Sequence, residues 1–383
     1  MKKKIAIIVT APIAVKIHLF DLVESLKEDY SVFIMTNLSK VNDEFLNYLP
    51  RDLTLIDTKM EREINLFKDL RSLFILILNL KKNNIELSFS LTPKAGLLAS
   101  LASFVSFIPV RIHVFTGQVW LTKSGLRRFI LKGLDRLIYS LSTKVLIDST
   151  SQRDFLLENN IVKEKKSLVL GSGSFCGVDT LRFIPSDEHR ISMRKKYNLS
   201  PDQIVYLFVG RLKKDKGVFE LIESFSHLRS VHKNINLWLL GPDEENIKNQ
   251  ILSNKMSKEG IEFIPFSPNP ELFMNAADIF CLPSYREGFG TVIIESASCG
   301  IPAIGTRIYG LKDAIEDGIT GLLVGVKEIE SLKHAMERLL QDHVMRKKMG
   351  ETARMRAKEE FDQRKVIKRI LEFLDSEYKK VAD

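Results

Sequence analysis

Short apolar runs alternate along this chain with segments in which apolar residues recur every three or four positions. This alternation is typical of βαβ units that build parallel sheets. In the first half it predicts strands at 4–9, 31–35, 54–56, 85–89, 110–114 and 144–147. Amphipathic helices are expected between these strands, for example at 17–28 and 66–82. A second series of strands, again with helices between them, is predicted at 204–209, 236–240, 261–264, 278–282 and 301–304.

The length and one irregular segment predict two domains. A chain of 383 residues is too long for one ordinary core. The stretch from Gly171 to Pro185 is rich in Gly and Ser and has no helical period, so we interpret it as a hinge. The expected domains are therefore residues 1–175 and 176–363, followed by a charged segment of helical period from about 364 to the end.

Composition is that of a soluble globular protein, with 45% hydrophobic and 27% charged residues. Cys176, Cys281 and Cys299 have no spacing suited to a metal or to a disulfide framework, which indicates a reducing cytoplasm. The apolar run after the first lysines breaks at Pro12, and we interpret it as a buried strand rather than a secretory signal. The other apolar run, around 73–80, is too short to span a bilayer.

The net charge of +9 is unevenly distributed. Residues 1–180 contain 25 Lys/Arg and 18 Asp/Glu, a difference of +7, whereas residues 181–383 contain 32 and 30, a difference of +2. A basic first half suggests that it meets an anionic surface or substrate. Nucleic acid is not expected, because the basic residues are not interleaved with aromatics and no recognition motif is present.

One basic amphipathic helix is predicted in the first half. Its apolar residues follow helical spacing and are Leu126, Phe129, Ile130, Gly133, Leu134, Leu137, Ile138 and Leu141. Its opposite face holds Arg127, Arg128, Lys132 and Arg136, with Lys123 just before it. We expect the apolar stripe to pack on the core and the basic side to face solvent. That basic side could also rest on anionic lipid.

The most informative stretch runs from Pro283 to Gly290 and follows a strand-like run. It is a glycine-containing turn that opens a helix, and N–H groups at a helix start attract anions. Glu287 lies in the turn and Glu295 eight positions later, so two carboxylates flank a phosphate-sized site. Carboxylates bind polyols well because they only accept hydrogen bonds. The alternative is a capped surface helix with two solvated glutamates.

A second loop, 209–217, supplies candidate cations. Arg211 and Lys216 follow a predicted strand and precede a predicted helix, at the sheet edge where open α/β folds bind ligands. Fixed cations can neutralise a departing diphosphate without a metal. Alone, such a loop could equally be a solvated basic turn.

These elements together resemble the retaining glycosyltransferases of glycosyltransferase family 4. The resemblance rests on Gly210-Arg211-Leu212 with Lys216-Gly217, on Pro283-Ser284, on Glu287 and Glu295, and on the run 317–324. It implies the α/β GT-B fold, in which two Rossmann-like domains with parallel sheets face each other across a cleft. It also implies that the C-terminal helix, about 364–383, packs back on the first domain.

The resemblance assigns roles to individual residues. It implies that Glu287, Arg211 and Lys216 act in catalysis, Glu287 on the donor sugar and the two cations on the diphosphate. The implied donor and nucleotide site consists of Gly210, Arg211, Lys216, Glu287, Gly288, Phe289, Gly290 and Glu295. The implied acceptor side consists of His18, Lys94, His113 and Thr116. Thr116 stands where many members have a histidine, and Pro265 stands where relatives often have glycine near the base.

The function that follows is transfer of a hexosyl or N-acetylhexosaminyl group, with retention, from a nucleoside-diphosphate sugar. The expected acceptor is a lipid-linked saccharide in polysaccharide, O-antigen or capsule biosynthesis. No cofactor or metal is expected. We place the protein in the cytoplasm, either free or peripheral on the anionic inner face of the plasma membrane. The alternatives are a nucleotide-sugar epimerase on the same fold and a non-catalytic protein that binds a sugar nucleotide.

Overall fold

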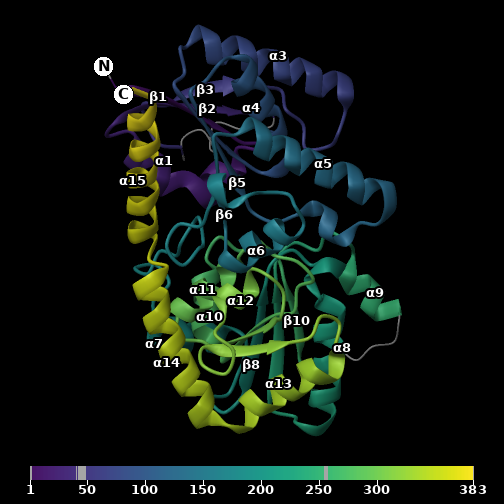
Figure 1. The fold of residues 1–383 in the computed structure, drawn as a ribbon. Helices are drawn as coiled ribbons and strands as arrows, with labels where there is room; N and C mark the ends of the chain where they lie inside the picture. The colour runs from purple at the N-terminus through teal and green to yellow at the C-terminus, as the bar shows by residue number, and fades with distance from the viewer. Residues whose placement is uncertain (1, 40, 42–48, 254–257, 383) are drawn as a thin grey trace. The chain divides into compact units, whose positions relative to one another are not determined.

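A computed structural model describes residues 2–39, 41, 49–253 and 258–382 (Figure 1). The chain divides into two compact units. Unit 1 comprises Met1–Cys176 and Lys365–Asp383, and unit 2 comprises Gly177–Arg364. The predicted boundaries, at 175/176 and near 364, differ from these by one residue. The first junction therefore lies inside the Gly- and Ser-rich segment that we interpreted as a hinge.

Unit 1 is built on a parallel sheet in the order β3-β2-β1-β4-β5-β6-β7. Its strands are β1 (Lys3–Ile8), β2 (Tyr30–Thr36), β3 (Thr54–Asp57), β4 (Leu87–Leu91), β5 (Val110–Phe115), β6 (Lys144–Ile147) and β7 (Ser167–Leu168). Its helices are η1 (Val15–Leu19), α1 (Phe20–Leu26), α3 (Leu66–Lys82), α4 (Pro93–Val105), η2 (Val119–Thr122), α5 (Gly125–Leu141), α6 (Thr150–Glu158), η3 (Glu164–Lys166) and α15 (Gln363–Ala382).

Two layers of helices cover this sheet. The helices α3 and α4 pack their buried residues against one side of β1 and β2, and α5 lies beside α4 (Figure 1). The helices α1 and α15 cover the other side, where Val366, Ile370 and Leu374 enter the core of the first strands. An ion pair of 2.9 Å between Lys3 and Asp375 fastens α15 to the start of β1. The C-terminal helix thus belongs to unit 1, although it is distant from it in sequence.

Unit 2 has its own parallel sheet in the order β10-β9-β8-β11-β12-β13. Its strands are β8 (Ile204–Val209), β9 (Ile235–Leu240), β10 (Ile261–Ile264), β11 (Ile279–Leu282), β12 (Ala303–Thr306) and β13 (Gly321–Val324). Its helices are α7 (Asp187–Lys196), η4 (Lys214–Lys216), α8 (Val218–Val231), α9 (Ile247–Ser253), α10 (Pro270–Ala276), α11 (Thr291–Ser298), α12 (Leu311–Ala314), α13 (Ile329–Gln341) and α14 (His343–Glu360).

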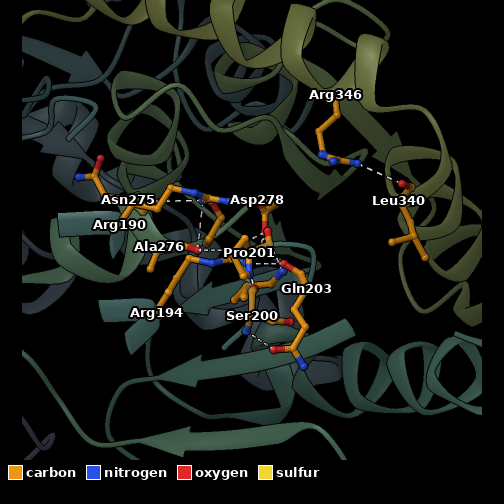
Figure 2. A network of polar contacts seen from close by, with 12 residues as sticks. Arg190, Arg194, Ser200, Pro201, Gln203, Asn275, Ala276, Asp278, Leu340 and Arg346 are labelled. Carbon is orange, nitrogen blue, oxygen red and sulfur yellow. Dashed lines mark hydrogen bonds and ion pairs between the residues drawn. The ribbon is translucent and has the colours of Figure 1, made fainter. Parts of the chain in front are cut away.

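A buried polar network fixes the start of β11 beside β8 (Figure 2). The Asp278 carboxylate accepts hydrogen bonds from Arg190 at 2.7 Å and from the Val205 backbone N–H at 2.9 Å. Arg194, also on α7, lies 3.3 Å from the same carboxylate. Because two guanidinium groups and a backbone N–H share one buried carboxylate, its charge is balanced and α7 is tied to the sheet.

The order of strands places the carboxyl ends of β8 and β11 side by side, because these two strands are neighbours in the sheet. The loops that carry Lys216 and Glu287 follow these strands. The α/β class and the parallel sheets that the sequence predicts are confirmed. The strands β7 and β13 were not predicted. The first has two residues, and the second begins at a glycine, so neither presents a run of apolar residues long enough to stand out.

Candidate active site

The turn between β11 and α11 is held in a shape that requires glycine. Gly290 is the residue before the helix and has φ +84°, in the left-handed region. A side-chain carbon there would lie 2.5 Å from Leu311 Cδ2, so only glycine fits without movement. Gly290 has no side chain, so no side-chain cap accepts a hydrogen bond from the N–H groups of the first turn of α11. A helix start of this kind suits an anion.

The remainder of the turn is anchored to the core of unit 2. Phe289 is buried and packs edge-on against Phe361, with ring centroids 5.2 Å apart. Thr306 donates a hydrogen bond to the Ser284 carbonyl from the neighbouring strand. The Phe289 side chain therefore positions the turn, and what it offers a ligand is its backbone.

The loop after β8 packs directly on this turn. Gly217 has φ +69°, and a side-chain carbon there would lie 2.0 Å from the Pro283 carbonyl oxygen. The Tyr285 N–H donates to the Asp215 carbonyl at 2.9 Å. An ion pair of 3.2 Å joins Arg286 to the Asp215 carboxylate. Two loops that are far apart in the sequence are thus fastened into one structure.

Lys216 and Glu287 meet in this structure. Lys216 Nζ lies 2.6 Å from Glu287 Oε1, and the two side chains are 18% and 14% exposed. The two residues are 71 positions apart in the chain. At this distance the pair is a charge-assisted hydrogen bond that holds each group in one orientation. One cation and one carboxylate are therefore fixed beside the start of α11.

Arg211 follows Gly210 at the end of β8 and has a different partner. Its Nη1 lies 3.4 Å from Glu244 Oε2, and Lys213 Nζ lies 3.0 Å from the same oxygen. Glu244 follows β9 on the other side of β8. In this structure the Arg211 guanidinium is therefore engaged toward β9, and Lys216 is the predicted cation that contacts Glu287.

Glu295 lies on α11, one turn beyond the helix start, and is half-buried. Burial raises the pKa of its carboxyl to about 7, and the nearby Glu271 raises it further while Arg182 opposes the shift. Arg182 is itself paired with Glu271 at 2.7 Å. Near neutral pH the Glu295 carboxyl is therefore only partly ionised.

The predicted acceptor-side residues lie in unit 1, and the contacts of Lys94 and His113 do not bring these two side chains together. Lys94 Nζ lies 2.6 Å from Asp69 Oδ1 and also donates to the Glu63 carbonyl, so it links α4 to α3. Thr116 follows β5 and is half-buried. The backbone of His18 belongs to η1, and its side chain lies outside the described part of the chain.

His113 is enclosed in the core at 2% exposure. Its Nδ1 lies 2.9 Å from Ser90 Oγ, and burial lowers its pKa to about 3. A side-chain carbon on Gly96 would lie 2.2 Å from the His113 ring, so this glycine makes room for the imidazole. The ring is therefore neutral at physiological pH and packs between β4, β5 and α4.

Several residues at the site were not predicted. They are Asp215, Glu220, Glu244, Tyr285 and Arg286. Tyr285 donates a hydrogen bond to Glu220 on α8, and burial is the main cause that raises the pKa of this phenol. A sequence signal existed for Glu244, because three consecutive acidic residues follow the predicted strand at 236–240. No periodicity singled out Glu220.

Known proteins can now be compared with this site. The family model for glycosyl transferases group 1 matches residues 189–356, which include both loops of the site. The capsular polysaccharide biosynthesis glycosyltransferase CapM of Staphylococcus aureus is 32% identical over 79% of this chain and 80% of its own length. The N,N'-diacetylbacillosaminyl-diphospho-undecaprenol alpha-1,3-N-acetylgalactosaminyltransferase of Campylobacter jejuni is 26% identical over 83% of this chain and 84% of its own length.

A solved structure of Anabaena HepE in complex with UDP and glucose has the same fold. It superimposes with a TM-score of 0.80, at 17% identity, over 98% of this chain and all of that one. Two units with parallel sheets and a C-terminal helix that returns to the first unit define the GT-B fold of the glycosyltransferases. The chain belongs to the group 1 glycosyl transferases, and it is a glycosyltransferase.

Proposed function

We propose that unit 2 binds a nucleoside-diphosphate sugar and that the enzyme transfers the sugar, with retention, to a lipid-linked saccharide. The observation that carries this proposal is the Lys216–Glu287 pair beside the uncapped start of α11. A diphosphate requires a cation and N–H donors, and a sugar requires a carboxylate that accepts from its hydroxyls. Both kinds of group are held here within a few ångströms of each other.

Donor binding would exchange the partners of this pair. The diphosphate replaces Glu287 at the Lys216 ammonium, and the helix start adds backbone N–H groups from the other side. Glu287 then turns its free lone pairs to the sugar hydroxyls. Glu295 accepts from the ribose, one turn farther along α11. Gly210, Gly288 and Gly290 let the backbone approach the ligand closely.

The chemical step needs stabilisation of the leaving diphosphate. Lys216 and the first turn of α11 supply fixed positive charge where negative charge develops, and this role needs no metal ion. Arg211 joins them if it leaves Glu244 when the donor binds. In retaining transfer of this kind the departing phosphate itself takes the proton of the acceptor hydroxyl. The reaction is then expected to keep its rate in the presence of EDTA.

The acceptor is proposed from the chemistry of the relatives. The relative from Campylobacter jejuni carries diphospho-undecaprenol in its name, and the relative from Staphylococcus aureus is named for capsular polysaccharide biosynthesis. We place this enzyme at the cytoplasmic face of a membrane, where its acceptor would reside. Among the described residues no helix is long and apolar enough to cross the bilayer.

Our proposal uses neither Lys94 nor His113 as a reacting group. The Lys94 charge is already engaged by Asp69, and His113 is neutral and enclosed. Thr116, at the carboxyl end of β5, is retained as an acceptor-side contact.

The test is incubation of the full-length enzyme with radiolabelled nucleotide sugars, with and without a lipid-linked acceptor. Transfer, or slow hydrolysis of the donor, supports the proposal, whereas isomer formation would indicate an epimerase and inert binding a scaffold. Lys216→Ala and Glu287→Ala should each lower the rate at least about 100-fold, because each removes a group fixed for the transition state. Lys333→Ala, which breaks an ion pair on α13, is the matched control and should leave the rate unchanged.

A further inference from the structure

Much of the apolar stripe of α5 is exposed, although we expected the stripe to pack on the core; Ile138, near the end of the helix, is buried as expected. Leu126, Phe129, Ile130 and Leu137 are exposed, and Phe129 is 70% exposed. Part of the basic side contacts its own unit, whereas Lys123 and Arg127 are exposed. Lys132 donates to Asn159 at 2.9 Å, Arg136 donates to the Asn160 carbonyl at 3.0 Å, and Lys132 lies 5.0 Å from the centre of the Trp120 ring.

The helix α3 also has an exposed apolar stripe. Leu66, Phe67, Leu70, Phe74 and Leu78 follow helical spacing on one face and are exposed. Ser72, Leu76 and Leu80 are buried on the opposite face, so the helix is already fully seated on its core. The exposed stripe therefore has no role in the packing of unit 1.

The end of α4, which lies between α3 and α5, completes this surface (Figure 1). Phe104, Val105 and Phe107 are exposed there, Phe107 by 86%. Phe107 has φ +56°, a left-handed conformation, at the position after the helix end where glycine is the usual residue. The Ile108 N–H donates to the Ser103 carbonyl at 2.9 Å, which closes the helix end around it. A strained, almost fully exposed phenylalanine gives nothing to folding.

We define the apolar face as the exposed residues of these three helices and the loop before α3. They are Ile64, Leu66, Phe67, Leu70, Phe74, Leu78, Phe104, Val105, Phe107, Leu126, Phe129, Ile130 and Leu137. Exposed apolar residues gathered on neighbouring helices are typical of interaction sites in soluble proteins. In unit 2 the exposed apolar residues are scattered along the chain instead.

The charges around the apolar face select its partner. The exposed charged residues of α3 and α5 are all basic and comprise Lys68, Arg71, Lys81, Lys82, Arg127 and Arg136. The two acidic residues of these helices are engaged, Asp69 with Lys94 and Asp135 with the Trp120 indole at 2.7 Å. In the loop before α3, Glu63 is exposed and Glu61 is paired with Lys68, so the border is mainly cationic. An apolar face with such a border complements an anionic phospholipid surface.

We propose that the apolar face of α3, α4 and α5 inserts into the headgroup region of an anionic membrane, and that unit 1 is held there mainly by burial of its phenylalanines. The choice of a membrane as partner rests on the proposed lipid-linked acceptor. The mode of attachment differs from the electrostatic contact of a basic helix side that the sequence suggested, because Lys132 and Arg136 contact unit 1 while the phenylalanines are exposed.

The first experiment is co-sedimentation of the full-length enzyme with vesicles of phosphatidylglycerol and phosphatidylcholine. Binding should persist in about 1 M NaCl, where electrostatic contacts are screened within about 3 Å. The double variant Phe74→Gln/Phe129→Gln should bind at least about tenfold more weakly, because burying each phenyl ring contributes roughly a tenfold factor or more. The control Ile191→Gln/Val231→Gln alters two equally exposed apolar residues of unit 2 and should bind like the wild type.

A second variant separates a role in binding from a role in folding. Phe107→Gly should weaken vesicle binding and at the same time raise the melting temperature by roughly 2 °C, since glycine tolerates the left-handed backbone. A variant that loses both binding and stability would assign Phe107 to the fold and count against the proposal.

Three results would overturn the proposal. The wild type could remain in the supernatant, its binding could vanish in about 1 M NaCl, or it could form a dimer that the double variant dissociates, which would assign the face to a second copy of the chain. Hydrolysis of a soluble nucleotide sugar is measured in parallel without lipid. If the enzyme hydrolyses the nucleotide sugar but does not bind vesicles, only the proposed membrane surface is overturned. If it binds vesicles but does not hydrolyse the nucleotide sugar, only the proposed catalytic function is overturned.

Discussion

At the scale of single residues, the site depends on which cation meets which carboxylate. The sequence indicated Arg211, Lys216, Glu287 and Glu295 as a set, without pairing them. In the structure Lys216 is paired with Glu287, and Arg211 with Glu244. Strand order places both carboxylates within reach of the loop after β8, because Glu287 follows β11 on one side of β8 and Glu244 follows β9 on the other.

The pKa of Glu295 leads to a prediction about pH. The carboxyl titrates at about 7 in the folded protein and near 4.5 when exposed, so its ionisation opposes folding as the pH rises through this window. Glu295→Gln should therefore be more stable than the wild type at about pH 8, by an amount on the order of 1–3 kcal/mol. At about pH 4 the two proteins should differ little on this account.

The same ionisation should govern nucleotide binding. A charged carboxylate accepts stronger hydrogen bonds from ribose than a protonated one. Affinity for UDP, measured by calorimetry, should rise more steeply between about pH 6 and 8 in the wild type than in Glu295→Gln, where the terminal phosphate of UDP, with a second pKa of about 6, still titrates. An identical pH profile in both proteins would remove Glu295 from the nucleotide site.

At the scale of elements, tight backbone approaches set the position of the site loops. Gly217 lies at the junction of η4 and α8, where its backbone touches the Pro283 carbonyl. This contact brings the loop with Lys216 against the turn with Glu287. The sequence favoured glycine-rich loops as phosphate sites, and here the glycine also serves close packing between two loops.

Gly217→Ala should therefore lower both stability and donor affinity. We expect a loss of roughly 1–3 kcal/mol in the free energy of unfolding, since alanine is strained at φ +69° and meets a backbone oxygen. Gly133→Ala is the control, because a side-chain carbon there meets nothing within 4 Å. In the middle of α5 it should stabilise the protein by about 0.5–1 kcal/mol. Chemical denaturation of both variants measures the difference.

At the scale of the whole molecule, the chain consists of two units with separate sheets and cores. The core of unit 2 runs from Val178 to Phe361, and all of its described residues come from unit 2. Its two ends are joined by a parallel bridge between Val178 and Asp362, and the Asp362 carboxylate accepts hydrogen bonds from Thr180 and Arg364. Unit 2 therefore has what a domain needs to fold alone.

A protein made of residues 177–364 should fold cooperatively and bind UDP with a Kd within about a factor of ten of the full-length value. UDP at about 100 times its Kd should stabilise it by roughly 2.7 kcal/mol, seen as a shift in melting temperature. It should transfer no sugar, because the acceptor side is absent. If the isolated unit 2 folds but does not bind UDP, unit 1 contributes to the donor site.

The sequence by itself determined the α/β class, most strands, the two-domain division and the loops that hold the candidate site. These follow from local periodicity and from residue types at fixed spacing, which one chain displays directly. Tertiary structure alone decided that much of the apolar stripe of α5 is exposed, that His113 is enclosed and that Lys216 rather than Arg211 pairs with Glu287. Periodicity tells which residues share a face of a helix, but only the neighbouring elements determine whether that face meets the core, because burial and ion pairing depend on groups brought together from distant parts of the chain.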